Sequence, residues 1–247
     1  MKTNILITGI PRSGKSTALR KAISDLSPKV GFVTNEVREH GERSGFEIET
    51  YNRQRATLAS LHLPTPYKVP RHSVPGSYYY LQPDSLEAIL PGIQTFTPED
   101  LLYIDELGQM QLGSEKLQQT AQCYLDAPNT ALFTISAVYS HPFIDLVKQR
   151  NDSILVQITE ETREQQQTYI GKLIGKIAKA KKYATESERF LPYREETVLV
   201  SEHGRRTLTK KGEEWNCDCD FHKKHDLCSH SMALEAVIQQ HSLSRNL

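Results

Sequence analysis

One short segment near the N-terminus limits the folds open to this chain of 247 residues. It reads Gly9-Ile10-Pro11-Arg12-Ser13-Gly14-Lys15-Ser16-Thr17 and fits the pattern G-x-x-x-x-G-K-[ST]. Glycines let the backbone bend until successive N–H groups point inward, and the following helix aims its positive end at the same place. We therefore expect these nine residues to bind a nucleoside triphosphate. Lys15 would reach its β- and γ-phosphates, and Ser16 would offer its hydroxyl to Mg²⁺.

The residues around this loop predict the fold class. Short apolar runs occupy residues 4–8, 30–34, 46–51, 101–104, 131–136 and 154–158, and helix-like segments occupy 15–26, 114–126 and 141–150. This alternation predicts an α/β fold, a P-loop NTPase in which a parallel sheet is sandwiched by helices. Residues 52–98 are rich in proline, so we expect loops there, with a turn of helix at 84–90.

Two acidic residues, Asp105 and Glu106, follow the apolar run at 101–104. Carboxylates at the carboxyl end of a buried strand cost free energy unless they meet a cation or a polar ligand. We expect Asp105 to hold Mg²⁺, mainly through its water shell. Glu106 would be the general base that orients and deprotonates the attacking water. The alternative for Glu106 is a helix N-cap or a surface carboxylate.

Several other polar residues are open to more than one role. Ser136, at the end of the run 131–136, is either a sensor of the γ-phosphate or an ordinary strand-end hydroxyl. Arg12, Arg38 and Arg43 are candidates for stabilising charge in the transition state, with solvated surface arginines as the alternative. The sequence contains no Asn-Lys-x-Asp signature for guanine. Both ATP and GTP therefore remain candidate substrates.

Three further segments resemble the cancer-related nucleoside-triphosphatase family, small P-loop enzymes also found in thermophilic prokaryotes. Residues 31–46 resemble its G-F-x-T-x-E-V-R and R-x-G-F segments, residues 104–110 its I-D-E-I-G-x-M, and residues 141–142 with 157–161 its closing strand. The resemblance implies slow hydrolysis of several nucleoside triphosphates. It adds Glu36, Arg38 and Arg43 to the candidate site. The chain has Arg12 where the family usually has glycine, and residues 52–98 match poorly.

A second constellation of reactive side chains lies near the C-terminus. Cys217-x-Cys219 and Cys228-x-His230 are two close pairs of ligands, a set that suits tetrahedral Zn²⁺. His222 and His225 are alternative ligands, and three buried or redox-active cysteines without a metal are another possibility. Because clustered cysteines in a reducing cytosol favour metal over disulfide, we expect zinc. Cys123, in a helix-like stretch, is expected to be a buried small residue.

The chain becomes basic after residue 165. Residues 166–247 contain 14 Lys and Arg against 11 Asp and Glu. Apolar residues at helical spacing predict a basic amphipathic helix in a linker, 166–192, between a P-loop domain, 1–165, and a zinc domain, 193–247. Strands at 197–201 and 205–210 and a helix at 231–240 predict a β-hairpin followed by a helix. Such a small core needs a staple.

The segment from about residue 179 to 239 resembles a SWIM zinc finger, whose signature is C-x-C-x(n)-C-x-H. The resemblance implies a structural zinc and a DNA or protein partner. Nucleic-acid contact would rest on Arg205, Arg206, Lys210, Lys211, Lys223 and Lys224. Trp215 is either a platform for a base or part of the small core.

These features together predict a Mg²⁺-dependent P-loop hydrolase that converts nucleoside triphosphates to diphosphates and phosphate. A zinc finger would tether it to DNA, RNA or a protein. A nucleoside or small-molecule kinase, with residues 38–55 over an acceptor pocket, and a non-enzymatic nucleotide-gated adaptor are the alternatives. No apolar run approaches the roughly 18 residues that cross a bilayer, and the run at 5–7 is too short for a signal peptide. We expect a cytoplasmic protein without membrane contact.

Overall fold

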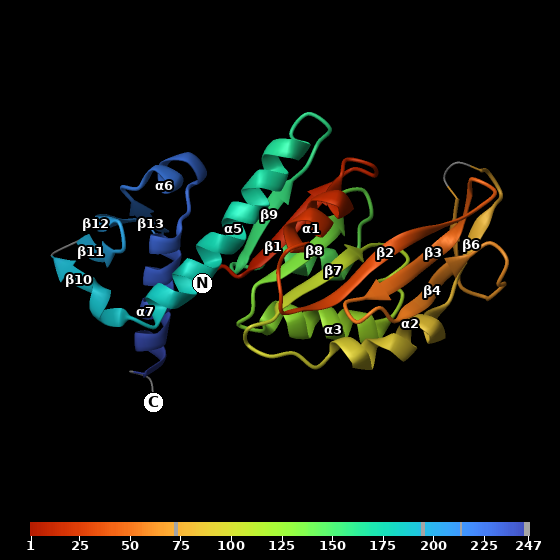
Figure 1. Ribbon diagram of the computed structural model, residues 1–247, viewed down its shortest axis with the longest axis horizontal. Helices are drawn as coiled ribbons and strands as arrows, with labels where there is room; N and C mark the ends of the chain where they lie inside the picture. Colours follow the sequence, from red (N-terminus) through yellow and green to blue (C-terminus); the bar gives the residue numbers. More distant parts are fainter. Residues whose placement is uncertain (72–73, 194–195, 213, 245–247) are drawn as a thin grey trace. The chain divides into compact units, whose positions relative to one another are not determined.

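The computed structural model describes residues 1–71, 74–193, 196–212 and 214–244. The chain forms two compact units (Figure 1). The first is Thr3–Ile170, and the second combines Met1–Lys2 with Gly171–Leu247. The boundary falls within helix α5 (Arg163–Ala184), which is the helix that the spacing of apolar residues predicts. No helix among the described residues has the length and apolar character needed to span a membrane.

The first unit is built on a nine-stranded sheet in the order β5-β6-β4-β3-β2-β7-β8-β1-β9. Its parallel part consists of β1 (Asn4–Gly9), β2 (Lys29–Glu39), β7 (Leu101–Leu107), β8 (Ala131–Ser136) and β9 (Ser153–Gln157). Its antiparallel part consists of β3 (Glu42–Thr50), β4 (Arg55–Ser60), β5 (Lys68–Pro70) and β6 (Tyr78–Leu81). The α/β fold is confirmed, but the sheet is mixed.

The antiparallel half corrects two sequence-based expectations. The run at 46–51 is not a parallel strand, because β3 turns back from β2 and pairs with it through Phe32 and Thr50. The stretch 52–98 is not mainly loop, because it contains β4, β5 and β6. These strands are short, and Pro70 ends the edge strand β5. Proline is compatible with an edge strand, where an outward N–H needs no partner, so its presence was misleading.

Helices cover both faces of this sheet (Figure 1). They are α1 (Lys15–Ile23), α2 (Pro83–Ile89), the 3₁₀ turn η1 (Leu90–Ile93), α3 (Glu115–Asp126) and α4 (Pro142–Lys148). One buried cluster joins α2, α3 and α4 to β2, β3, β4, β7 and β8. In Figure 1, α1 lies on the other face from α2 and α3. Cys123 of α3 is exposed, so the expectation that it is buried was wrong: Ala121, Tyr124 and Leu125 form the buried side of that helix.

The second unit contains a four-stranded antiparallel sheet in the order β10-β11-β12-β13. The elements after α5 are η2 (Ser187–Arg189), β10 (Phe190–Tyr193), β11 (Glu196–Ser201), β12 (Gly204–Lys211), β13 (Glu214–Cys217), α6 (Asp220–His225) and α7 (Ser229–Ser244). The predicted hairpin is β11–β12, and the predicted last helix is α7. The sequence did not reveal β10, β13 or α6. Each is only four to six residues long, which is too short for a hydrophobic period to show.

Candidate active site and Cys–His cluster

The glycine-rich loop runs from the end of β1 to the start of α1. Gly14 has a φ of 104° at the N-cap of α1, a left-handed conformation that glycine adopts without strain. Gly9 has no room for a side chain, because a Cβ there would lie 2.4 Å from Ser13 Oγ and 2.5 Å from the carbonyl oxygen of Ile158. Arg12 also has a positive φ, 68°. The backbone at Arg12 is therefore one that glycine would adopt more easily.

Lys15 is folded back onto the loop that carries it. Its side chain is buried, and Nζ donates to the carbonyl oxygens of Gly9 at 3.0 Å and Ile10 at 3.2 Å. The ammonium group thus lies inside the loop curve, where the phosphates of a nucleotide would be. Binding a phosphate would exchange these carbonyl contacts for charged ones.

Asp105 is the most deeply buried acid of the site, with no exposed surface. Its Oδ1 accepts hydrogen bonds from Ser16 Oγ at 2.8 Å and Thr134 Oγ1 at 2.6 Å. Within the described residues, Oδ2 has no hydrogen-bond partner, and the nearest cation is Arg20 Nη2 at 3.8 Å. Burial raises the pKa of Asp105, against the hydrogen bonds from Thr134 and Ser16. A buried carboxylate with one unpaired oxygen beside a hydroxyl fits Mg²⁺ or its water shell.

Glu106 lies next to Asp105 at the carboxyl end of β7 and is half-buried. Gly108 leaves space for it, since a Cβ there would approach Glu106 Oε1 to 3.2 Å. Burial raises the pKa of Glu106; the charge of Lys15 opposes this rise and the charge of Asp105 adds to it. A carboxylate whose pKa is shifted upward is a better proton acceptor near neutral pH than an ordinary one.

Thr134 and Arg20 contact Asp105, and neither residue belongs to the site predicted from the sequence. Thr134 is a fully buried polar residue within the apolar run of β8, an unusual position that could have marked it. Arg20 lies one helical turn after Ser16 on α1. Thr34 also reaches this group, since its hydroxyl donates to the backbone oxygen of Asp105.

The arginines of the β2–β3 hairpin form a cluster of their own. Arg38 Nη2 lies 2.7 Å from Glu36 Oε2, and Arg43 pairs with Oε1 of the same carboxylate. Although burial opposes it, the hydrogen bonds from both arginines lower the pKa of Glu36. Arg38 also donates to the carbonyl oxygen of Gly41 at 3.1 Å. These contacts connect the three predicted residues to one another rather than to Lys15 or Asp105.

Ser136 lies opposite Gly9 in the pairing of β8 with β1. Its hydroxyl oxygen accepts from the backbone N–H groups of Val138 at 3.4 Å and Tyr139 at 3.1 Å. The side chain therefore stabilises the turn after β8 at a position beside the first residue of the loop. This contact is one that an ordinary strand-end hydroxyl makes, and a role for Ser136 in sensing the γ-phosphate stays a prediction.

Comparison with known proteins identifies the first unit. A sequence profile of the NTPase family matches residues 4–170. The chain belongs to the NTPase family. Nucleoside-triphosphatase THEP1 of Thermotoga sp. (strain RQ2) is 36% identical over 160 residues, which are 64% of this chain and 88% of that protein. The cancer-related nucleoside-triphosphatase of Homo sapiens is 30% identical over 66% of this chain and 92% of that protein.

A solved structure supports the same conclusion. The crystal structure of THEP1 from the hyperthermophile Aquifex aeolicus aligns with a TM-score of 0.59 and 26% sequence identity, over 69% of this chain and 98% of that chain. The residues that match the NTPase family include the glycine-rich loop, the acidic end of β7 and the β2–β3 hairpin.

The second unit holds a cluster of four buried side chains, Cys217, Cys219, Cys228 and His230. Their Sγ and ring-nitrogen atoms all lie within 4.8 Å of one another. His230 Nδ1 is 3.5 Å from Cys217 Sγ and 3.7 Å from Cys228 Sγ. Cys217 ends β13 and Cys219 is the N-cap of α6, whereas the second pair lies where α7 begins.

Hydrogen bonds hold this Cys–His cluster in place. The backbone N–H groups of His222 and Ser231 donate to Cys219 Sγ and Cys228 Sγ, each at 3.4 Å. Burial lowers the pKa of His230, but hydrogen bonds to Cys219 and Cys228 raise it to about 9. The ring of His230 stacks on Tyr183, with centroids 6.0 Å apart.

The two alternative histidine ligands do not belong to the cluster. His222 Nε2 lies 3.2 Å from Asn216 Oδ1, and the ring of His225 packs against Phe221. Among the described residues, the group that could hold a metal consists of the two predicted pairs. Its members are all soft or borderline ligands, so the set suits Zn²⁺ better than Mg²⁺.

Proposed function

We propose that this chain hydrolyses nucleoside triphosphates to nucleoside diphosphates and phosphate in a Mg²⁺-dependent reaction. Membership of the NTPase family makes it a hydrolase of nucleoside triphosphates, and the similar proteins of Thermotoga and human carry that activity in their names. The roles of these residues rest on one observation. Asp105 accepts a hydrogen bond from Ser16 at 2.8 Å, and Glu106 is the next residue of β7.

Each part of the site has a distinct role in this proposal. Residues 9–17 bind the triphosphate through backbone N–H groups, and Lys15 neutralises charge on its β- and γ-phosphates. Ser16 and Asp105 would hold Mg²⁺, which supplies positive charge to the phosphate oxygens. Glu106 takes a proton from water as the water oxygen bonds to the γ-phosphorus. The bond from that phosphorus to the bridging oxygen then breaks, and the diphosphate leaves.

Arg38 and Arg43 are proposed to add positive charge in the transition state. Both are paired with Glu36, so this role requires them to exchange a carboxylate for phosphate oxygens. Arg38 is more than half exposed, and it can move without disturbing the core. Glu36 would hold the two guanidinium groups until the nucleotide arrives.

The test is phosphate release from ATP and GTP with Mg²⁺ and no acceptor molecule. Glu106→Gln should reduce turnover by roughly a hundredfold or more, because it removes the proton acceptor, while nucleotide affinity is kept. Glu115→Gln, which changes an exposed carboxylate at the start of α3, is the matched control. If Glu106→Gln and Glu115→Gln release phosphate at equal rates, Glu106 is not the general base. Release that requires an added acceptor would favour the kinase alternative.

We further infer that the Cys–His cluster holds a structural Zn²⁺. Zinc bonds of about 2.3 Å to sulfur and about 2.0–2.1 Å to nitrogen place tetrahedral ligands about 3.6 Å apart. The separations of 3.5 and 3.7 Å from His230 Nδ1 to two sulfur atoms support this geometry. Four protein ligands leave no position for water, so the metal would stabilise the fold and not catalyse a reaction. The reducing cytoplasm, where we expect the protein, would keep the thiols available.

We propose that the second unit binds nucleic acid, because its Cys and His spacing resembles a SWIM finger and it exposes several Lys and Arg side chains. A protein partner is the alternative. Arg205, Lys210, Lys211, Lys223 and Lys224 are all exposed. Fluorescence anisotropy with labelled single- and double-stranded DNA and RNA tests this. Binding that weakens as salt rises, and that Lys210→Gln with Lys211→Gln reduces, would support nucleic acid. Lack of binding to all four probes at low salt would leave the protein partner.

A further inference from the structure

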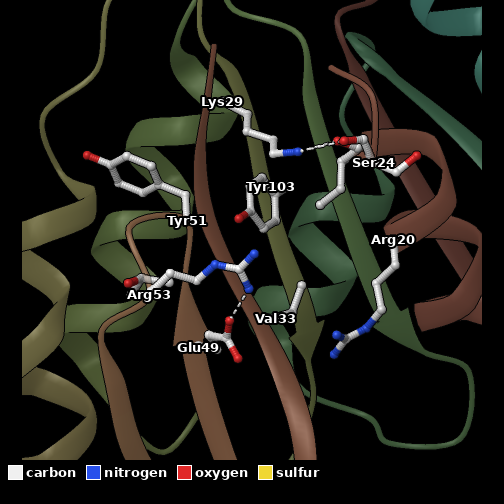
Figure 2. A pocket seen from close by; sticks show the side chains of 10 residues that line it. Arg20, Ser24, Lys29, Val33, Glu49, Tyr51, Arg53 and Tyr103 are labelled. Atoms are coloured by element: carbon white, nitrogen blue, oxygen red, sulfur yellow. Dashed lines mark hydrogen bonds and ion pairs between the residues drawn. The ribbon is translucent and has the colours of Figure 1, made fainter. Parts of the chain in front are cut away.

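A hollow of about 260 Å³ opens beside α1, and its lining does not include residues 9–17 of the glycine-rich loop. Residues of α1, β2, β3 and β7 line it, and Figure 2 shows the side chains that face it. Val33 and Tyr103 belong to its sheet side. Arg20 comes from α1, whereas Arg53 and Glu49 lie on the other side of Val33 (Figure 2).

The charges around the hollow favour an anion. Its lining contains three cationic side chains, Arg20, Lys29 and Arg53, against the single carboxylate of Glu49. That carboxylate accepts from Arg53 at 2.6 Å and from Arg55 at 3.0 Å, so Arg53 and Glu49 balance each other, while Arg20 and Lys29 of the lining and the adjacent Arg55 leave an excess of positive charge. Burial raises the pKa of Tyr103 to about 12, so its phenol stays neutral and can donate a hydrogen bond. A concave surface with excess positive charge concentrates anions.

Polar contacts join this hollow to Asp105. Arg20 Nη2, 3.8 Å from Asp105 Oδ2, donates to the carbonyl oxygen of Thr34 at 2.7 Å and to Asn35 Oδ1 at 2.9 Å. Asn35 Nδ2 in turn donates to Glu49 Oε2 at 3.3 Å. Arg20 therefore belongs to both places: it lines the hollow, and it is the cation nearest to the unpaired oxygen of Asp105.

We propose that the hollow is a second binding site for a small tetrahedral oxyanion, held between Arg20 and Arg53, that regulates the Mg²⁺ requirement of the NTPase site. Arg20 and Mg²⁺ are both positive, and both are attracted to Asp105. An anion that draws the Arg20 charge toward the hollow removes a competitor from that carboxylate. The bound anion then lowers the Mg²⁺ concentration needed for turnover. This regulatory part rests on the proposed function, whereas the binding itself does not.

Calorimetric titration with inorganic phosphate tests the binding directly. The glycine-rich loop is first saturated with Mg²⁺ and a non-hydrolysable ATP analogue, so that the probe cannot bind there. We expect one further phosphate site in the wild type and about tenfold weaker binding in Arg53→Gln, which loses one of the two clamping cations. Arg55→Gln is the matched control, because Arg55 pairs with the same Glu49 but does not line the hollow. Absence of a second site in the wild type, or equal affinity in Arg53→Gln, would overturn the proposal.

Two further probes identify the source of the anion. Tighter binding of glycerol phosphate than of inorganic phosphate would point to a phosphorylated metabolite, and binding of inorganic phosphate alone would point to the reaction product. Either result supports a tetrahedral oxyanion site. Acetate that binds as well as phosphate would show only a non-specific positive surface and would contradict the proposal.

The regulatory part has a separate readout. Phosphate added to the wild type should lower the Mg²⁺ concentration that gives half-maximal hydrolysis, and it should not do so in Arg53→Gln. An unchanged Mg²⁺ dependence in the wild type, despite measured binding, would refute the coupling. If hydrolysis itself is absent, the proposed function fails while the calorimetric result still decides whether the hollow binds phosphate.

Discussion

The two polar clusters of this chain depend on the surrounding fold in opposite ways. Asp105 lies at the end of β7, inside a sheet whose strands are packed by α2, α3 and α4 through a large apolar cluster. The Cys–His cluster lies between the end of β13 and the start of α7, beside a four-stranded sheet whose described residues bury three large apolar side chains, Phe190, Leu199 and Leu208. In the first unit the core positions the carboxylate. In the second, we propose that Zn²⁺ held by these four side chains joins β13 to α7 and replaces part of a core.

The largest effect should come from removing the metal, or one ligand, from the Cys–His cluster, because this tests whether only the second unit depends on it. A zinc-selective chelator, or Cys228→Ser, should unfold much of the second unit, because structural zinc contributes on the order of 10 kcal/mol. The first unit should keep its protected amides and its turnover with Mg²⁺. Hydrogen exchange read by mass spectrometry, with phosphate release, measures both. Cys123→Ser, which changes an exposed cysteine of α3, should alter neither quantity. A second unit that stays protected without metal would show that its apolar core suffices.

The sequence predicted residues whose chemistry is local and missed those that depend on strand pairing. In the glycine-rich loop and in the Cys–His pairs, the spacing of residues a few positions apart determines the local geometry. Thr134 reaches Asp105 only because β8 pairs with β7, so that Phe133 lies beside Ile104. That register comes from the order of strands in the sheet, which no local pattern specifies. The hairpin of Glu36, Arg38 and Arg43 was predicted by resemblance, but its pairing into a separate cluster was not.

A smaller test concerns how the core holds Asp105. Thr134→Val keeps the shape of the side chain and removes the hydroxyl that donates to Asp105 Oδ1 at 2.6 Å. A hydrogen bond to a charged group contributes about 1.5–3 kcal/mol, so we expect that loss of unfolding free energy at neutral pH. Thr120→Val is the control: this buried hydroxyl donates to the neutral carbonyl oxygen of Lys116 and accepts from Gln94 Nε2 at 3.1 Å, and each of these neutral hydrogen bonds should contribute about 1 kcal/mol. A loss at Thr134 no larger than that of one neutral hydrogen bond, about 1 kcal/mol, would mean that Asp105 gains nothing from its charge.

The pH dependence of the free energy of unfolding tests whether the ionised form of Glu106 destabilises the folded chain. Burial raises its pKa above the ordinary value of 4.5, so the folded chain holds this proton more tightly than the unfolded chain. The stability due to the protonated form is complete below pH 4.5 and is lost as pH rises through the folded-state pKa. Glu106→Gln cannot ionise. Without Mg²⁺ and nucleotide, the variant should therefore have a higher Tm than the wild type at pH 7, with the difference shrinking toward pH 4. A lower Tm at pH 7 would contradict this account.

The smallest expected effect concerns Arg12, and it separates two roles for that residue. At a φ of 68°, a non-glycine residue costs roughly 1–2 kcal/mol of strain, which Arg12→Gly would relieve. Glycine loses more backbone entropy on folding, about 0.5–1 kcal/mol, so the two effects nearly cancel and the free energy of unfolding should change by less than about 1 kcal/mol. Turnover then decides the role. An unchanged rate means that the loop needs only the backbone of Arg12. A rate reduced about tenfold or more means that its guanidinium stabilises the transferring phosphoryl group, and that the strain is retained for this purpose.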